Sequence, residues 1–126
     1  MSLDGLYTIK RVHCDKDSNR HSVLIGLDPS HEIFKGHFPE NPILPGVCII
    51  QILKEIIVHQ TGFKLFLDYA DSIKFLSFLR PGINNQATLV TEVKEIDNDN
   101  IFCNAFLQSE SVVFFRFKGN FKVMKG

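Results

Sequence analysis

A segment of unusual composition lies in the first half of the chain, directly before its most apolar stretch. Residues 31–47 read HEIFKGHFPENPILPGV and contain three prolines and two glycines. These two residue types favour irregular backbone paths that regular helices and strands do not follow. Because a rigid segment of this kind holds side chains in fixed positions, we expect the chemistry of the protein to lie here.

A helix is predicted to begin where this segment ends. Its first backbone N–H groups, at Gly46 and Val47, have no partner within the helix, and the helix dipole adds positive charge at the same place. Donors of this kind can hold a carbonyl oxygen that gains negative charge during a reaction. The sequence therefore predicts an oxyanion-binding position at the helix start.

The predicted helix covers residues 45–60, because Pro45 suits a first helical turn and Thr61-Gly62 follows as a stop signal. On a helical wheel, Gln51, Lys54 and Glu55 cluster on one side, and apolar residues form a wide arc on the other. So wide an arc indicates a helix that is buried on most sides. The arc comprises Ile49, Ile50, Ile52, Leu53, Ile56 and Ile57.

Alternation of apolar and polar residues predicts strands elsewhere. Residues 113–124 give the clearest strand. Further strands are predicted over 71–79, 86–96 and 101–108, which form an antiparallel meander with it, and over 6–14 and 23–27 before the helix. A single apolar helix among many strands is typical of a curved sheet wrapped around it, so we predict an α+β fold with one domain over residues 1–126. The predicted buried face of the last strand consists of Val113, Phe115, Phe117, Phe121 and Val123.

Composition excludes several classes of protein. The 14 basic and 14 acidic residues leave no basic excess for nucleic acid. No apolar run approaches the roughly 18 residues of a membrane span, and the first residues lack a signal-peptide pattern, so we expect a cytoplasmic protein without a membrane partner. Cys14, Cys48 and Cys103 are odd in number and far apart, which predicts reduced core thiols. Four histidines lack the spacing of metal ligands, so no metal is expected: His13, His21, His31 and His59.

The run from Gly36 to Val47, GHFPENPILPGV, closely resembles the signature of the hot-dog 3-hydroxyacyl-(acyl carrier protein) dehydratases. That signature is G-H-F-P-x-x-P-x-x-P-G followed by Val or Cys, and in the family it joins a strand to a central helix. The resemblance continues along the remaining chain and includes Phe75. It also includes Arg80-Pro81-Gly82, which is similar to the family's second Pro-Gly turn. The family usually has an acid after that turn, and this chain has Ile83.

This resemblance implies a hot-dog fold and a homodimer, or a larger assembly of dimers, with an acyl tunnel at the subunit interface. It implies a 3-hydroxyacyl thioester substrate carried on the phosphopantetheine of an acyl carrier protein or CoA, and no further cofactor. His37 matches the catalytic histidine that takes the proton alpha to the thioester carbonyl. Gly46 matches the residue whose N–H polarises that carbonyl. Phe38, Pro39 and Val47 are the expected substrate-binding residues.

The chain departs from the family at the catalytic acid. Fourteen residues after the histidine the family places Glu or Asp, which the partner subunit contributes to help the hydroxyl leave as water, and this chain has Gln51. General acid–base assistance is worth about 10²–10⁴ in rate, and an amide has no proton to give at neutral pH. Three hypotheses follow. Gln51 orients a water or the substrate hydroxyl while His37 returns its proton; Glu55, one turn further on, supplies the acid; or a related subunit supplies it in a heterodimer.

Three functions therefore remain open at this point. The first is a dehydratase-like lyase of fatty acid or polyketide-like biosynthesis, with Gln51 as part of its catalytic group. The second is a hot-dog thioesterase, and the third is a non-catalytic acyl-binding or assembly subunit, for which Gln51 is a solvent-facing helix residue. Four basic residues near the C-terminus either steer an acidic carrier protein or form a solvated strand face: Arg116, Lys118, Lys122 and Lys125.

Overall fold

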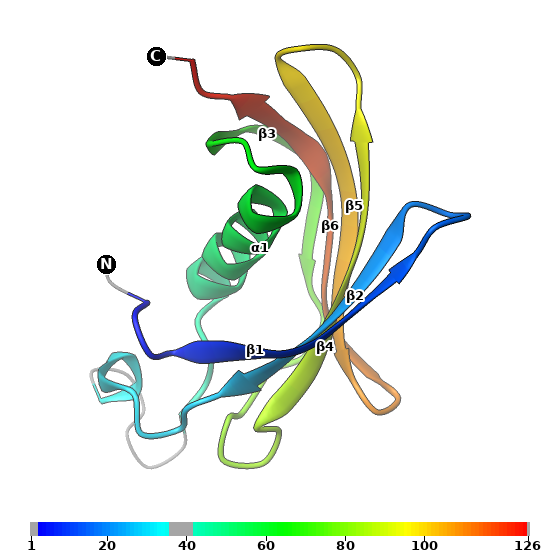
Figure 1. Ribbon diagram of the computed structural model, residues 1–126. Coiled ribbons are helices and arrows are strands. Elements are labelled where there is room, and N and C mark those ends of the chain that lie inside the picture. Colours follow the sequence, from blue (N-terminus) through cyan, green and yellow to red (C-terminus); the bar gives the residue numbers. More distant parts are fainter. Residues whose placement is uncertain (1–2, 36–41, 126) are drawn as a thin grey trace.

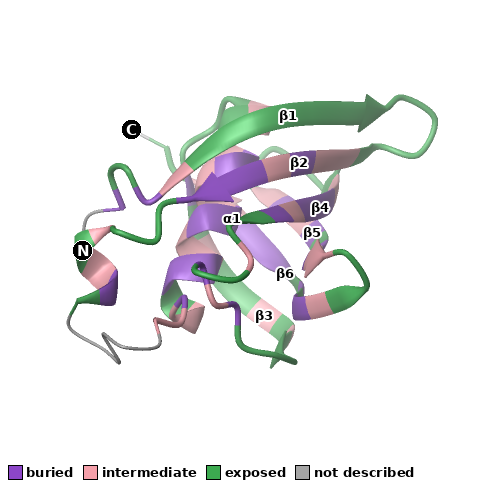
Figure 2. Ribbon diagram, turned by 90° about the horizontal axis from the view of Figure 1, so that it is seen from below, coloured by how far each residue is buried: buried purple, intermediate pink, exposed green. Residues whose placement is uncertain are grey.

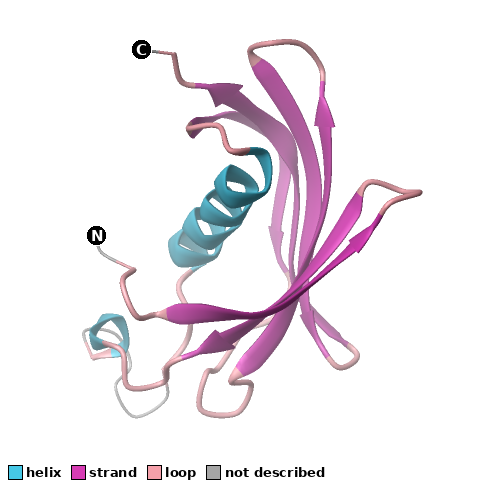
Figure 3. Ribbon diagram, viewed as in Figure 1, coloured by secondary structure: helices cyan, strands magenta, loops and turns pink. Residues whose placement is uncertain are grey.

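The computed structural model describes residues 3–35 and 42–125 of the chain. One long helix lies inside the curve of a six-stranded antiparallel sheet, which confirms the predicted α+β arrangement (Figure 1, Figure 3). The elements follow in the order β1 (Tyr7–Asp15), β2 (Arg20–Leu27), a short 3-10 helix (Glu32–Phe34), α1 (Gly46–Thr61), β3 (Leu65–Phe75), β4 (Gln86–Glu95), β5 (Asn100–Ser109) and β6 (Val112–Val123).

The helix agrees with the sequence prediction to within one residue at each end. Pro45 occupies the N-cap with extended backbone angles, and Gly62 ends the helix in the left-handed conformation at φ 78°, where its N–H donates to the Val58 carbonyl. The side chains of Ile52, Leu53 and Ile57 are almost fully buried. Packing against the concave face of the sheet therefore holds a helix whose many β-branched residues are only moderate helix formers.

The order of strands in the sheet is β1-β2-β4-β5-β6-β3. The predicted four-strand meander is wrong in its first member, because β3 pairs with β6 and only β4, β5 and β6 follow one another as hairpins. The predicted strand over residues 71–79 is also misplaced, since β3 covers Leu65–Phe75. Irregularities at Leu67/Tyr69 and Ala70/Ser72 shift the side-chain alternation in β3, so a period-two pattern cannot identify the first half of this strand.

The burial of β6 differs from the simple alternation that its sequence suggests. Phe115, Phe117 and Phe121 are buried as predicted, with neighbouring rings 5.6–6.4 Å apart. Phe114 and Asn120, predicted on the outer face, are also buried, at 2% and 4% exposed. The Phe114 carbonyl accepts hydrogen bonds from the N–H groups of the two residues after β3, and the Asn120 amide donates to Asn100 Oδ1 at 2.9 Å.

The cysteine prediction is correct for two of the three thiols. Cys48 and Cys103 are buried, and burial raises the pKa of both, that of Cys103 to about 12. Cys14 is exposed, so its prediction as a core thiol is wrong. It lies in β1, a strand at the edge of the sheet that is exposed along nearly its whole length (Figure 2). Over the described ranges, no helix combines the length and the apolar character needed to cross a membrane.

Candidate functional site

The start of α1 presents backbone donors, as the sequence predicts. The Pro45 carbonyl accepts from Cys48 N at 3.0 Å and from Ile49 N at 3.2 Å, which closes the first turn. Among residues 3–35 and 42–125, no backbone carbonyl accepts from the N–H of Gly46 or of Val47. These donors lie at the positive end of the helix dipole, so the geometry suits an oxygen that carries partial negative charge.

The ring of Phe75 lies directly against Gly46. A Cβ atom at position 46 would come within 2.6 Å of Phe75 Cζ, a distance that real side chains do not tolerate. Phe75 also contacts Phe115, with the ring centroids 5.5 Å apart, and its side chain is 53% exposed. A Cβ atom at position 46 would therefore force the Phe75 ring to move, and Phe75 forms an apolar wall beside the two backbone donors. Val47, an expected substrate-binding residue, is 65% exposed at the same end of the helix.

Three of the predicted site residues, His37, Phe38 and Pro39, lie outside the described residues. The described chain on either side of them is anchored in the core. Phe34 before them is 3% exposed, and Leu44 after them is 3% exposed and donates its N–H to the Leu79 carbonyl at 2.9 Å.

Gln51 is half-buried, and its amide takes part in a hydrogen-bonded chain of three side chains. Gln51 Nε2 donates to Glu55 Oε2 at 3.1 Å, and the Tyr7 hydroxyl donates to Glu55 Oε1 at 2.7 Å. Burial and then the bond to Glu55 raise the pKa of Tyr7 above its ordinary value, so this hydroxyl keeps its proton and remains a donor. A role in the site and the position of a partly solvent-facing helix residue beside Glu55 both fit this arrangement. Tyr7 was not identified from the sequence, because it lies 48 residues from Glu55 and belongs to no motif.

A mostly apolar hollow of about 330 Å³ lies beside Glu55, further along the helix from Gln51. The hollow lies on the same side of α1 as the hydrogen-bonded side chains of Gln51 and Glu55, and it is open to solvent. A chain of methylene groups is the kind of ligand that apolar walls with few polar groups accommodate. Its lining residues are Lys54, Glu55, Val58, Lys64, Leu65 and Met124.

His31 has a structural role before the proline-rich segment. His31 Nδ1 accepts from the Ile33 N–H at 3.0 Å, so its other ring nitrogen, Nε2, is the donor to the Asp4 carbonyl at 2.9 Å. His31 in this way caps the short helix before the proline-rich segment. Within the part of the chain that the structure describes, no three His, Cys, Asp or Glu side chains come together as a metal site.

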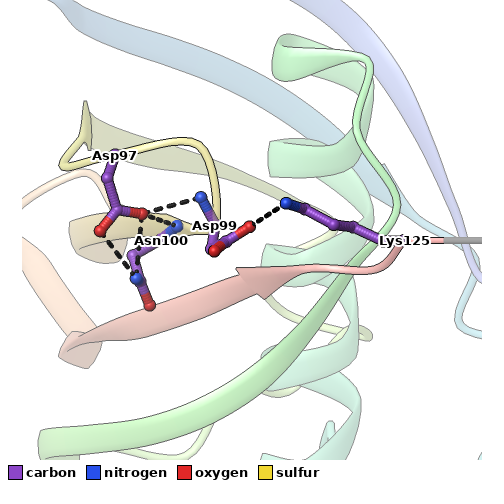
Figure 4. A network of polar contacts seen from close by, with 4 residues as sticks. All are labelled: Asp97, Asp99, Asn100 and Lys125. Atoms are coloured by element: carbon purple, nitrogen blue, oxygen red, sulfur yellow. Dashed lines mark hydrogen bonds and ion pairs between the residues drawn. The ribbon is translucent and has the colours of Figure 1, made fainter.

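The basic residues near the C-terminus do not form one rim. Lys125 pairs with Asp99 in the turn between β4 and β5, where Asp97 accepts the N–H groups of Asp99 and Asn100 (Figure 4). Arg116 and Lys118 lie instead on the outer face of the sheet, over the rings of Phe106 and Phe102. Because Lys125 lies apart from Arg116 and Lys118, the basic residues fit a solvated strand face better than a continuous surface for a carrier protein.

Residues 13–113 match the family described as ApeI-like, ApeI dehydratase. The chain belongs to the ApeI-like dehydratase family. The matched range includes Gly46, Gln51, Glu55 and Phe75, which form the described part of the site. The resemblance noted from the proline-rich motif is thus confirmed at the level of the family.

Curated relatives of this ApeI-like chain are bacterial dehydratases. The chain is 32% identical over 88 residues to the 3-hydroxyacyl-(acyl-carrier-protein) dehydratase FabZ of Lactobacillus helveticus, which covers 64% of this chain and 60% of that protein. It is 40% identical over 87 residues to the enzyme of the same name from Thermotoga neapolitana, which covers 65% and 60%. The chain thus spans about 60% of the length of these relatives.

Solved structures similar to the ApeI-like chain confirm the hot-dog fold. One is the dehydratase heterocomplex ApeI:P from Xenorhabdus doucetiae, with a TM-score of 0.64, 22% identity, and coverage of 91% of this chain and 98% of that chain. Another is the putative thioesterase YhdA from Lactococcus lactis, with a TM-score of 0.65, 10% identity and coverage of 98% of both chains. At these identities the likeness concerns the fold, which dehydratases and thioesterases share.

Proposed function

We propose that this protein interconverts (3R)-hydroxyacyl thioesters and trans-2-enoyl thioesters. The observation that carries the proposal is the open start of α1 at Gly46, with the Phe75 wall beside it, in a chain of the ApeI-like dehydratase family. Backbone donors at this position can stabilise the negative charge that develops on the thioester oxygen during the reaction.

In the proposed mechanism, His37 takes one proton from C2 of the substrate. The electron pair of that C–H bond moves toward the thioester carbonyl, whose oxygen is held by the Gly46 N–H. The pair then returns to form the C2–C3 double bond as the C3–O bond breaks. The proton on His37 passes to the departing hydroxyl, so one water leaves and His37 is restored. Phe38, Pro39 and Val47 are proposed to contact the substrate around these atoms.

A second subunit is part of the proposal. Among the described strands, β3 forms one edge of the sheet, and it carries exposed apolar side chains there and just beyond its end. We propose that this edge pairs with a second copy of the chain or with a related subunit, and that the substrate arrives on the phosphopantetheine arm of an acyl carrier protein or CoA. The exposed apolar side chains are Tyr69, Ile73, Phe75, Leu76 and Phe78.

One observation favours a non-catalytic or heteromeric role as the second candidate. Both oxygens of Glu55 accept hydrogen bonds, and Gln51 carries an amide, so this polar chain offers no carboxylic acid proton to the leaving hydroxyl. A partner subunit with an acid at the position of Gln51 would supply that proton in a mixed dimer.

The test follows hydration of a trans-2-enoyl carrier-protein thioester by mass spectrometry. We expect the unmodified protein to add water and His37→Ala to lose this activity. Free thiol is measured in the same samples, because its release without hydration would assign the protein to the thioesterases. Saturable binding of the thioester without any turnover would assign it to the non-catalytic subunits instead.

A further inference from the structure

We infer that Glu55 and Tyr7 are positioning residues that hold the amide of Gln51 with its carbonyl oxygen available to the reacting hydroxyl or water. This inference rests on the proposed dehydratase function and extends it to two residues outside the motif. It also decides between two of the hypotheses for the missing acid, since it gives Glu55 a role other than proton donation.

The orientation of the Gln51 amide follows from the chemistry of its partner. A carboxylate only accepts hydrogen bonds, so the group that faces Glu55 Oε2 at 3.1 Å must be the NH₂ of Gln51. Because the amide is planar, fixing one N–H also fixes Gln51 Oε1 and the second N–H. One acceptor and one donor therefore remain for the substrate.

Tyr7 prevents Glu55 from changing partners. Its hydroxyl donates to Glu55 Oε1 at 2.7 Å, and its ring packs against the core from β1, where Tyr7 pairs with Leu27 of β2. The Glu55 carboxylate thus connects the helix to the first residue of β1. With a donor on each oxygen, Glu55 has no proton positioned for transfer to a substrate.

The hydrogen bond from Gln51 to Glu55 also changes the acceptor strength of the Gln51 carbonyl oxygen. An amide that donates to a carboxylate becomes more electron-rich, so its carbonyl oxygen is a stronger acceptor than that of a free glutamine. In the hydration direction, Gln51 Oε1 accepts one O–H of the attacking water and turns a lone pair of that water toward C3. In the reverse direction it accepts the hydrogen of the 3-hydroxyl group. Proton transfer remains with His37.

The experiment combines side-chain amide NMR with kinetics on three variants. Glu55→Gln replaces one of the two acceptor oxygens by a donor, so it can accept only one of the two hydrogen bonds, and Tyr7→Phe removes the donor of the other. Glu92→Gln is the matched control, because it makes the same chemical change in an exposed residue paired with Arg20 on β2. In the unmodified protein, one of the two Gln51 side-chain amide protons should exchange slowly with solvent, and this protection should be weaker in Glu55→Gln, where Gln51 and Tyr7 compete for one neutral acceptor.

For catalysis, we expect Glu55→Gln to lower kcat for enoyl hydration about 10- to 100-fold with little change in KM, since a misplaced group affects the transition state more than binding. Tyr7→Phe should lower kcat less, and Glu92→Gln should not change it. The inference is overturned if Glu55→Gln keeps both the amide protection and kcat. An unmodified protein without turnover would overturn the dehydratase proposal. The change in Gln51 amide protection in Glu55→Gln would still decide whether Glu55 holds the Gln51 side chain.

Discussion

The start and the middle of α1 lie less than two turns apart, yet they are built in opposite ways. At the start, backbone donors meet an apolar ring, and the fit depends on the absence of a side chain at Gly46. In the middle, Gln51 depends on a charged partner and on Tyr7 from a distant strand. In the proposed reaction, the helix start stabilises the enolate, and Gln51 in the middle of the helix binds the hydroxyl group. On the proposed mechanism, enolate stabilisation and assistance to the leaving hydroxyl group can therefore be lost or gained separately.

The largest effect is expected at the helix start. Gly46→Ala would place a Cβ 2.6 Å from Phe75 Cζ, so either the ring or the helix must move. Overpacking of this kind costs about 1–3 kcal/mol of stability, and displacement of an oxyanion donor costs about 100-fold in rate. Urea denaturation and enoyl hydration measure the two losses.

Phe75→Ala supplies the control for this clash. In that background, Gly46→Ala should cost little stability, because the ring that it strikes is gone. Equal costs of Gly46→Ala with and without the ring would show that Phe75 does not enforce glycine at this position.

The next largest effect is expected in the middle of the helix, where we predict that Gln51→Glu increases activity. Gln51→Glu places a second carboxyl group beside Glu55, and two carboxyls at this distance do not both ionise readily, so the pKa of the new group rises. A protonated acid at neutral pH should raise the rate of dehydration of a (3R)-hydroxyacyl thioester about 10- to 100-fold.

The pH profile checks the cause of this gain. Because the acid assists dehydration in its protonated form, the dehydration activity of Gln51→Glu should extend to higher pH when Glu55 is present and decline at lower pH in the double variant Gln51→Glu, Glu55→Gln. Identical profiles for the two variants would contradict the role assigned to Glu55.

A smaller effect is expected from Tyr7→Phe. The variant loses the bond to a half-buried carboxylate, which should lower the free energy of unfolding by about 1 kcal/mol.

The contribution of Tyr7 should also depend on pH. Its pKa in the folded state is raised above the value of 10.0, so its stabilising effect is present below pH 10 and declines at higher pH. Unfolding measured between pH 8 and pH 11 should show the difference between the unmodified protein and Tyr7→Phe shrinking above pH 10. A difference that stays constant over this range would contradict the assignment.

The smallest effect is expected at the turn between β4 and β5. Lys125→Met removes the ion pair with Asp99, which lies in solvent, and such pairs contribute little to stability. Thermal unfolding of the variant should match that of the unmodified protein. A clear loss would mean that the exposed network of Figure 4 stabilises the fold as strongly as the half-buried chain at Glu55.

The sequence predicted the features that depend on local signals. Pro45 and Gly62 fix the ends of the helix, and strict alternation identifies β5 and most of β6. The proline-rich motif led to the family because its spacing is short and fixed. These features need only residues that are neighbours in the chain.

Features that depend on distant contacts were missed or misplaced. The irregularities in β3 interrupt the alternation on which strand prediction depends, and its partner is β6, not the next strand along the chain. The bond between Tyr7 and Glu55 joins residues 48 positions apart, so the sequence showed Glu55 only as one polar residue beside Gln51. In the proposed mechanism, the orientation of Gln51 depends on that bond.

Exchange of the C2 proton of a (3R)-hydroxyacyl carrier-protein thioester in heavy water tests the central claim most directly. If the helix start stabilises the enolate and Gln51 lacks an acidic proton, the unmodified protein should introduce deuterium at C2 faster than it forms the enoyl product, and Gly46→Ala should lose the exchange. An unmodified protein that forms no deuterated substrate, or a Gly46→Ala variant that exchanges at the same rate, would contradict the account.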